Sequence, residues 1–343
     1  DIVKKRETGG DMADNPDVGL TLDGEQACSI CHGHERKVVS RIGRGFEKLT
    51  TVICTGCGLL QSHPMPTAAE LERFYAVDYR KKYKSTYEPK PKHVYRYAPG
   101  AYQRVAQLAA LAGPEQRRFL DIGSGSGEIL YMARRMGFEV TGIEPNTGYA
   151  QYTRAQLGLP VQNCNYEQAD LPKEHFDILN LNHVLEHLPD PLASLRFLNG
   201  LLRPGGILCV AVPDIAHTSH ASWTRFHYAH VHNFNHDTLK AMVLKSGFEL
   251  LPESTGSTTL IVRKTGAAFC DMPRPMEENY RRLWSSLTAS TSVAGHVASR
   301  RGIGRFVGKL YRYPKEYILA KTHGSPRAIL DHVFKRMDAA RRP

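Results

Sequence analysis

With 343 residues, the chain is long enough for one large folded domain with appendages. Its hydrophobic fraction of 41% and charged fraction of 23% are ordinary for a globular protein, and the lack of any long apolar stretch excludes a membrane-spanning helix. The net charge is +11, and residues 300–343 carry nine of these charges. Such a tail indicates contact with an anionic membrane face, nucleic acid or acidic glycans; the alternative is a solvated, partly helical appendage.

The first elements along the chain are a polar segment and two cysteine pairs. Residues 1–22 are rich in acids, Gly and Pro, do not resemble a secretion signal and lack an initiating Met. We expect them to be disordered and the gene product to extend beyond this sequence. In residues 23–66, two C-x-x-C pairs indicate metal in a reducing compartment rather than disulfides. We predict a closed structural zinc site whose ligands are Cys28, Cys31, Cys54 and Cys57.

Residues 67–100 are predicted to form a short helix and then a connector that ends at Pro99-Gly100. Tyrosines stack on sugar faces or bases, and the neighbouring cations contact phosphates. One interpretation is a lid over an acceptor site, and the other is a solvated linker whose tyrosines pack on the fold. The tyrosines concerned are Tyr79, Tyr83, Tyr87, Tyr95 and Tyr97.

From residue 101 to 266, strand and helix patterns alternate. This alternation is typical of an α/β fold with a parallel, doubly wound sheet. Seven strand-like runs occur, and only STGS separates the last two, so we expect those two to form an antiparallel hairpin at the sheet edge. Residues 267–343 are predicted to be a basic extension with helical pieces, EENYRRLWSSL and SPRAILDHVFKRM.

The stretch FLDIGSGSGEI places glycines directly after the first strand of this sheet, where parallel sheets bind ligands. A pyrophosphate-binding turn has a further glycine at position 128, and Glu128 would repel a phosphate there. S-adenosylmethionine carries no phosphate, and its cationic sulfonium and ammonium groups suit Asp121 and Glu128. Glu144 ends the second strand, where a carboxylate accepts ribose hydroxyls, although NAD sites use a similar acid.

Four segments together, FLDIGSGSGEI, GIEPN, FDILNLNHVLEHLPDP and LLRPGGILCVAVPD, resemble the signature segments of class I S-adenosylmethionine-dependent methyltransferases. The resemblance covers about residues 100–265 and implies a Rossmann-like methyltransferase fold with S-adenosylmethionine as cofactor. It implies that Glu144 binds the ribose, that Asn165 and Tyr166 lie beside the adenine, and that Asn182 lies near the sulfonium. It also implies a cradle for the methionine part, formed by Asp121, Gly123, Ser124, Gly125 and Gly127.

The second cysteine pair opens the segment CTGCGLLQSHPMPTAAELERFYAVDYRKKY. This segment resembles the zinc ribbon of methyltransferases associated with cell-surface glycan pathways, and of deoxysugar C-methyltransferases. Those C-methyltransferases carry a further folded C-terminal domain, whereas this chain has only residues 267–343 after its sheet. The resemblance therefore implies O-methylation of a sugar hydroxyl ahead of C-methylation.

Methyl transfer to a hydroxyl requires alignment of the reactants and removal of a proton, for which histidine is the natural base. Glu186 and His187 follow the fourth strand, and the segment HYAHVHNFN supplies His230 after the fifth. In the family pattern an acid stands at the position of Ala229, so the sequence removes one orienting carboxylate. We predict Glu186, His187 and His230 as catalytic candidates; a mechanism by proximity alone needs none of them.

The sequence thus predicts a cytoplasmic methyltransferase, peripheral at the inner membrane face, that acts on a saccharide-type or other small-molecule acceptor. The alternatives are an RNA methyltransferase, a quinone or polyketide O-methyltransferase, a sugar C-methyltransferase, and a non-catalytic scaffold. A nucleic-acid partner is disfavoured because the ribbon segment does not present one basic and aromatic face. The oligomeric state does not follow from the sequence.

Overall fold

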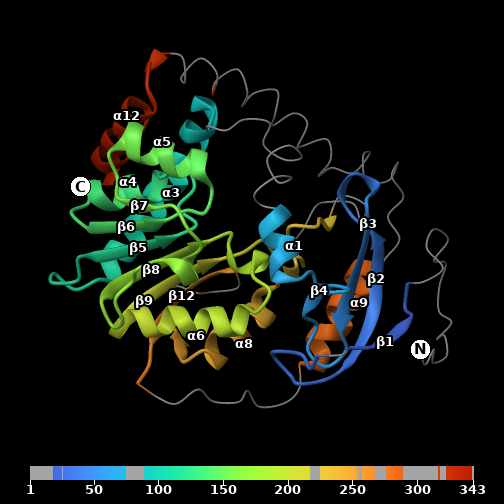
Figure 1. Ribbon diagram of the computed structural model, residues 1–343. Coiled ribbons are helices and arrows are strands. Elements are labelled where there is room, and N and C mark those ends of the chain that lie inside the picture. The colour runs from blue at the N-terminus through green and yellow to red at the C-terminus, as the bar shows by residue number, and fades with distance from the viewer. Residues whose placement is uncertain are drawn as a thin grey trace.

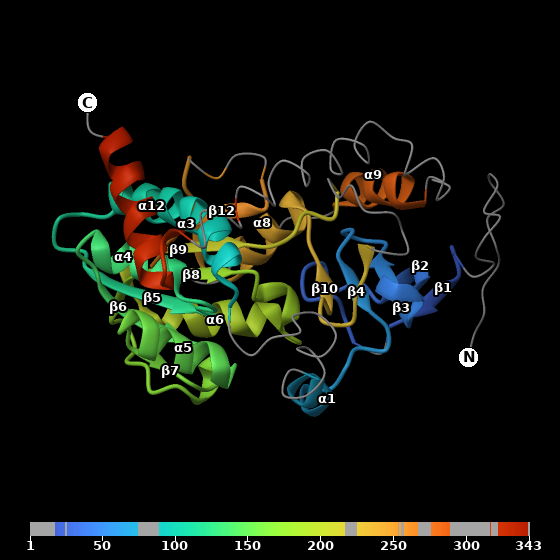
Figure 2. The ribbon, with the colours of Figure 1, turned by 90° about the horizontal axis from the view of Figure 1, so that it is seen from above.

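The computed structural model of the chain describes residues 18–24, 26–74, 89–216, 225–252, 254, 257–266, 276–288, 316 and 322–341. Two sheets form its framework, and the smaller lies beside the larger (Figures 1 and 2). No helix among these described residues is both long enough and apolar enough to cross a bilayer. Residues 1–17 of the predicted disordered segment, the connector tyrosines at 79, 83 and 87 and much of the basic tail lie outside the described residues. The disorder predicted for residues 18–22 is wrong at its end, because Thr21–Asp23 form strand β1 and pair with a neighbouring strand.

The larger sheet has seven strands in the order β11-β12-β9-β8-β5-β6-β7. Its strands β9, β8, β5, β6 and β7 run parallel, and β12 and β11 form the antiparallel edge. This confirms the predicted doubly wound, mostly parallel sheet and its terminal hairpin. The strands are β5 (Arg118–Ile122), β6 (Glu139–Ile143), β7 (Val161–Gln162), β8 (Phe176–Asn182), β9 (Leu202–Ala211), β11 (Phe248–Leu250) and β12 (Thr259–Lys264).

Alternate residues of the central strands pack into two apolar cores, one on each face of the sheet, because successive side chains of a strand point to opposite faces. Phe119 and Ile178 pack in the core shared with α3, α4, α5 and α12, whereas Leu120 and Leu179 pack in the core shared with α6 and α8 (Figure 1). These helices are α3 (Pro91–Leu111), α4 (Glu128–Arg135), α5 (Thr147–Leu157), α6 (Pro191–Leu201), α8 (His236–Lys245) and α12 (Pro326–Arg341).

The start of α3 differs from the sequence prediction. We expected a connector up to Pro99-Gly100, but the helix begins at Pro91 and continues through Pro99. Val94 and Ala98, one turn apart, are fully buried against the sheet core. An interior proline costs a helix about 3 kcal/mol, and the burial of this apolar face offsets that cost.

The smaller sheet has the order β1-β2-β3-β4-β10 and carries the paired cysteines at one end. Four of its strands come from the N-terminal region, but β10 comes from the segment after β9 and pairs antiparallel with β4. The sheet therefore joins the two halves of the molecule. Its strands are β1 (Thr21–Asp23), β2 (Glu35–Ile42), β3 (Lys48–Cys54), β4 (Leu60–Ser62) and β10 (His232–Asn233); α1 (Ala68–Arg73) follows β4, and α9 (Glu277–Thr288) packs beside the sheet.

The end of the basic extension is a docked helix. Ile329, Leu330 and Val333 of α12 are fully buried in the core that includes α3 and α4. The hydroxyl of Tyr131 in α4 donates to Asp331 at 2.7 Å. Both helical pieces predicted for the extension are confirmed as α9 and α12, but α12 is a packed element and not a solvated appendage.

Candidate functional site

The glycine turn lies between β5 and α4, at the carboxyl end of the sheet. Gly123, Gly125 and Gly127 have φ angles of +71°, +53° and +81°, which residues with a Cβ rarely adopt. A Cβ on Gly123 would lie 2.4 Å from Cγ2 of Val184, so the turn also approaches its neighbour closely. Both constraints explain why the sequence has glycine here.

Three carboxylates surround this turn, and all three are buried. Asp121, Glu128 and Glu144 are exposed by 2%, 7% and 7%, respectively. Burial, together with the charges of Glu144 and Glu128, raises the pKa of Asp121 to about 7, even though the amide of Asn180, which donates to its carboxylate at 2.7 Å, lowers that pKa. A cationic ligand would relieve this repulsion, whereas a phosphate would add to it.

Glu144 fastens the glycine turn to the end of β6. Its two carboxylate oxygens accept hydrogen bonds from the backbone N–H of Gly125 at 2.7 Å and of Asn146 at 2.8 Å. The hydroxyl of Ser124 is buried and has no hydrogen-bond partner among the described residues. The ribose-binding role of Glu144 and the cradle role of Ser124 remain predictions that this arrangement permits.

The residues predicted beside the adenine and the sulfonium lie at the same edge of the sheet. Asn165 precedes the 3₁₀ turn Tyr166–Gln168, and the buried Tyr166 hydroxyl donates to Ser194 of α6 at 2.8 Å. Asn182, at the end of β8, accepts a hydrogen bond from Arg104 of α3. Their ligand contacts also remain predictions.

A carboxylate ringed by imidazoles occupies the turn after β8. Glu186 is 1% exposed, and its Oε1 lies 3.4 Å from Nδ1 of His183, 3.7 Å from Nε2 of His187 and 3.8 Å from Nε2 of His230. The ring of His227 lies 3.7 Å from that of His230, centroid to centroid. Two segments, residues 183–187 and 227–230, thus form one cluster. We call it the Glu186 cluster.

The structure corrects our interpretation of position 229. We inferred from Ala229 that an orienting carboxylate had been lost, but Glu186 supplies a carboxylate beside His230. Ala229 also contributes through its backbone, because its carbonyl oxygen accepts a hydrogen bond from Nδ1 of His187 at 2.7 Å. His187 and His230 therefore have orienting partners although position 229 carries no carboxylate.

The histidines of residues 227–232 differ in their surroundings and in their pKa values. Burial, and then the neighbouring imidazoles, hold the pKa of His230 well below its ordinary value, and burial lowers that of His227 to about 3. His232 lies in β10, where its Nδ1 contacts the carbonyl oxygen of Leu188 at 3.1 Å and burial lowers its pKa to about 4. His232 therefore links β10 to Leu188, which directly follows the turn that holds Glu186 and His187.

The four paired cysteines converge at the end of the smaller sheet. Their sulfur atoms all lie within 4.8 Å of one another, with Cys28 to Cys57 at 3.6 Å and Cys31 to Cys54 at 3.4 Å. A tetrahedral zinc ion with bonds of about 2.3 Å to sulfur requires separations of about 3.8 Å. The four thiols therefore fit a closed zinc site.

Comparisons with known proteins show that the part of the chain that forms most of the larger sheet is similar to methyltransferases. Residues 93–253 match the family model described as a methyltransferase domain. A ubiquinone biosynthesis O-methyltransferase of Paramagnetospirillum magneticum is 41% identical over 93 residues, which cover 26% of this chain and 37% of that protein. One of Histophilus somni is 30% identical over 151 residues, or 40% of this chain and 60% of that protein. The solved Burkholderia thailandensis 1,6-didemethyltoxoflavin-N1-methyltransferase is 18% identical with a TM-score of 0.43, covering 63% of this chain and 96% of that one.

Residues 93–253 are thus similar to a methyltransferase domain, and we refer to them as the methyltransferase domain. The chain spans 37% and 60% of the length of the two curated relatives. The methyltransferase domain includes nearly all of α3, the glycine turn and Glu144, and both segments of the Glu186 cluster.

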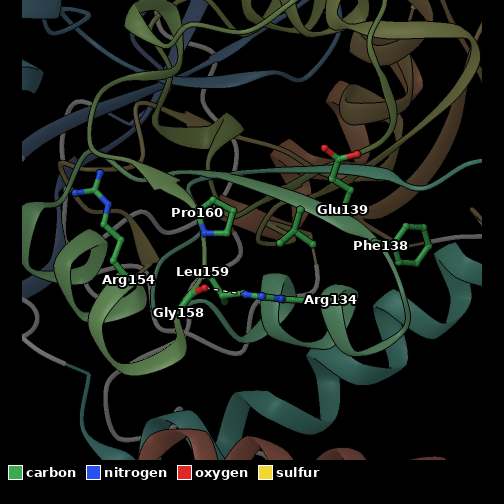
Figure 3. A pocket seen from close by; sticks show the side chains of 8 residues that line it. Arg134, Phe138, Glu139, Arg154, Gly158, Leu159 and Pro160 are labelled. Carbon is green, nitrogen blue, oxygen red and sulfur yellow. Dashed lines mark hydrogen bonds between the residues drawn. The ribbon is translucent and has the colours of Figure 1, made fainter.

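A hollow of about 580 Å³ lies elsewhere on the methyltransferase domain (Figure 3). It is lined where α4 and α5 end and β6 begins, which is the end of the sheet opposite the glycine turn. Arg134 crosses it and donates to the carbonyl oxygen of Gly158 at 2.7 Å. Its position separates it from the predicted donor site.

Three residues at the site received no firm role from the sequence. His183 and His227 contribute rings to the Glu186 cluster, and Arg104 contacts Asn182. The spacing His183-x-x-Glu186 and His227-x-x-His230 was a signal for the first two. Arg104 carries no sequence signal, because one arginine on a helix has many equivalent surface positions.

Proposed function

We propose that the protein transfers the methyl group of S-adenosylmethionine to a hydroxyl group of a small-molecule acceptor. The observation that carries this proposal is the trio of buried carboxylates at the glycine turn of a methyltransferase domain. Their charge favours a sulfonium donor over a phosphate-bearing one. The Glu186 cluster follows the adjacent strand β8, so it stands at the same edge as the turn.

The reaction needs three events at this edge. The S–CH₃ bond of the donor breaks as the acceptor oxygen forms its O–CH₃ bond, and the hydroxyl proton leaves to a nearby base or to water. S-adenosylhomocysteine and the methyl ether are the products. The Glu186 cluster brings a carboxylate and several imidazoles together beside the glycine turn, which supports its part in removing that proton.

The acceptor that the relatives favour is a hydroxyl of a ubiquinone-type precursor. The two relatives described above are both named ubiquinone biosynthesis O-methyltransferases. The sugar hydroxyl that the zinc ribbon suggested draws no support from these relatives. We therefore place phenolic and quinone-type hydroxyls first and saccharide hydroxyls second.

We also propose that Cys28, Cys31, Cys54 and Cys57 hold one structural zinc ion. Their tetrahedral spacing supports this, as does Nη1 of Arg36, which lies 3.7 Å from Cys54 Sγ and would offset the negative charge of the thiolates. A site closed by four sulfurs leaves no position for a substrate, so its contribution is to folding.

Calorimetry and an acceptor screen test the proposed function. Full-length protein is titrated with S-adenosylmethionine and separately with NAD, and we expect heat of binding from the first alone. Labelled donor is then incubated with phenolic quinone precursors, nucleotide-sugars and RNA. Heat from NAD without heat from S-adenosylmethionine would overturn the donor assignment, and label transfer only to RNA would overturn the acceptor class.

A further inference from the structure

The carboxylate of Glu186 is buried in a way that requires a cationic partner. Both of its oxygens are inaccessible, and neither has a hydrogen-bond partner among the described residues. Burial of an ionised carboxylate without a hydrogen bond is costly, and proteins avoid this cost by pairing the charge or by placing it on a metal. The carboxylate therefore points to a cation at this position.

The orientation of His187 narrows the choice of cation. A carbonyl oxygen only accepts, so the bond from His187 to Ala229 places the hydrogen on Nδ1. In the neutral ring, Nε2 then presents a lone pair toward Glu186 Oε1, 3.7 Å away. Two lone pairs facing each other need a positive centre between them. Metal-ligating histidines are held in the same manner, with the second nitrogen donating to a carbonyl oxygen.

The spacing of the three groups matches one shared ion. Ligand atoms of Glu186, His187 and His230 all lie within 4.8 Å of one another. A tetrahedral ion with bonds of about 2.0–2.2 Å to nitrogen and oxygen sets its ligands about 3.3–3.6 Å apart. The observed separations of 3.7 Å and 3.8 Å need only a small contraction to reach this geometry. One proton, by contrast, can join the carboxylate to only one of the two rings.

We propose that Glu186, His187 and His230 bind one divalent transition-metal ion, separate from the cysteine site. Two imidazoles and a carboxylate suit zinc, iron or cobalt better than magnesium, whose preferred ligands are oxygen atoms. Three protein ligands leave at least one coordination position open. His183, whose side chain is 55% exposed and 3.4 Å from Glu186, stands at the rim of that position.

The role of the ion rests on the proposed function, although its binding does not. The Glu186 cluster meets the donor turn directly, because Val184 occupies the space beside Gly123. An acceptor hydroxyl bound at the open position would lose its proton more easily, since a metal ion lowers the pKa of a bound oxygen. The resulting alkoxide or phenolate would face the methyl group.

Cobalt substitution of the full chain tests the site. Protein stripped by a chelator and reloaded with Co²⁺ should hold two equivalents, one with thiolate-to-cobalt charge-transfer bands and one with the visible bands of nitrogen and oxygen ligands. Glu186→Gln and His230→Gln should each lose the second equivalent and keep the thiolate bands, which report a folded ribbon. His175→Ala, a histidine outside the cluster, should keep both.

The outcomes separate this inference from the proposed function. A wild-type protein that takes up one cobalt, with thiolate bands alone, overturns the second site, as does equal cobalt content in wild type and Glu186→Gln. Binding of S-adenosylmethionine, measured by calorimetry on the same samples, should persist in Glu186→Gln. Its loss from the wild type would overturn the proposed function while leaving the metal result standing.

Discussion

The ionisation of Asp121 provides a sharp test of the donor site. Burial, with Glu144 and Glu128, raises the pKa of Asp121 to about 7, whereas an unfolded aspartate titrates near 3.9. The folded protein therefore binds this proton more tightly than the unfolded chain. The corresponding stability is fully present below about pH 4 and is lost as the pH rises through about 7. A pKa difference of about three corresponds to about 4 kcal/mol, of which about 2.5 kcal/mol falls between about pH 5 and pH 8.

Asp121→Asn removes this titration and keeps an oxygen that accepts from Asn180. Relative to wild type, the ligand-free variant should gain about 2.5 kcal/mol more unfolding free energy at about pH 8 than at about pH 5, measured by urea denaturation. Its affinity for S-adenosylmethionine should fall about 10- to 100-fold, because a hydrogen bond to a charged group contributes about 1.5–3 kcal/mol. The exposed Asp170→Asn is the matched control. An equal stability difference at both pH values, or undiminished donor affinity, would refute the reasoning.

Three further perturbations probe the turn, the cysteine site and the docked helix. Gly123→Ala should lose about 2–5 kcal/mol of unfolding free energy in urea, against about 1–2 kcal/mol for Gly137→Ala, because both have positive φ but only position 123 is crowded; equal losses would contradict the close approach. Cys57→Ser should lose zinc by elemental analysis and destabilise the ribbon by several kcal/mol, from a binding energy of about 10–16 kcal/mol; retained zinc at full stability would contradict the four-cysteine site. Leu330→Ala should cost about 2–5 kcal/mol in urea denaturation, whereas the exposed Lys335→Ala should cost less than about 0.5 kcal/mol; equal costs would contradict the docking of α12.

The sequence predicted the features that depend on local patterns. The alternation of strands and helices, the edge hairpin and the position of the glycine turn follow from alternating hydrophobic runs and from glycine spacing, which act over a few residues. The start of α3 did not follow, because Pro99 is a local signal against a helix. Only the tertiary burial of Val94 and Ala98 overrides that signal, and this burial is decided by the sheet beneath them.

The sequence named Glu186, His187 and His230 as candidates, but for a related reason it did not predict that they meet in one cluster. Glu186 and His230 are distant in the chain, and their meeting depends on where the segment after β9 is held. That segment forms β10, which adds a strand to the smaller sheet, and Ser62 of β4 donates its backbone N–H to Val231, the neighbour of His230, at 2.9 Å. No periodicity within residues 227–234 encodes this pairing.

Further contacts connect the cysteine turns to the methyltransferase domain. Nζ of Lys245, at the end of α8, donates to the backbone carbonyl oxygens of Ser29 and Ile30 in the first cysteine turn, both at 3.0 Å. The ribbon is thus held by the methyltransferase domain at one end, while its β4 edge holds the histidine segment at the other. Because these contacts connect the first cysteine turn to α8 and β4 to the histidine segment, disorder at the cysteines should reach His230 through the ribbon. The ribbon therefore supports the segment that carries His230, and we expect loss of the proposed zinc ion to alter the geometry of the Glu186 cluster.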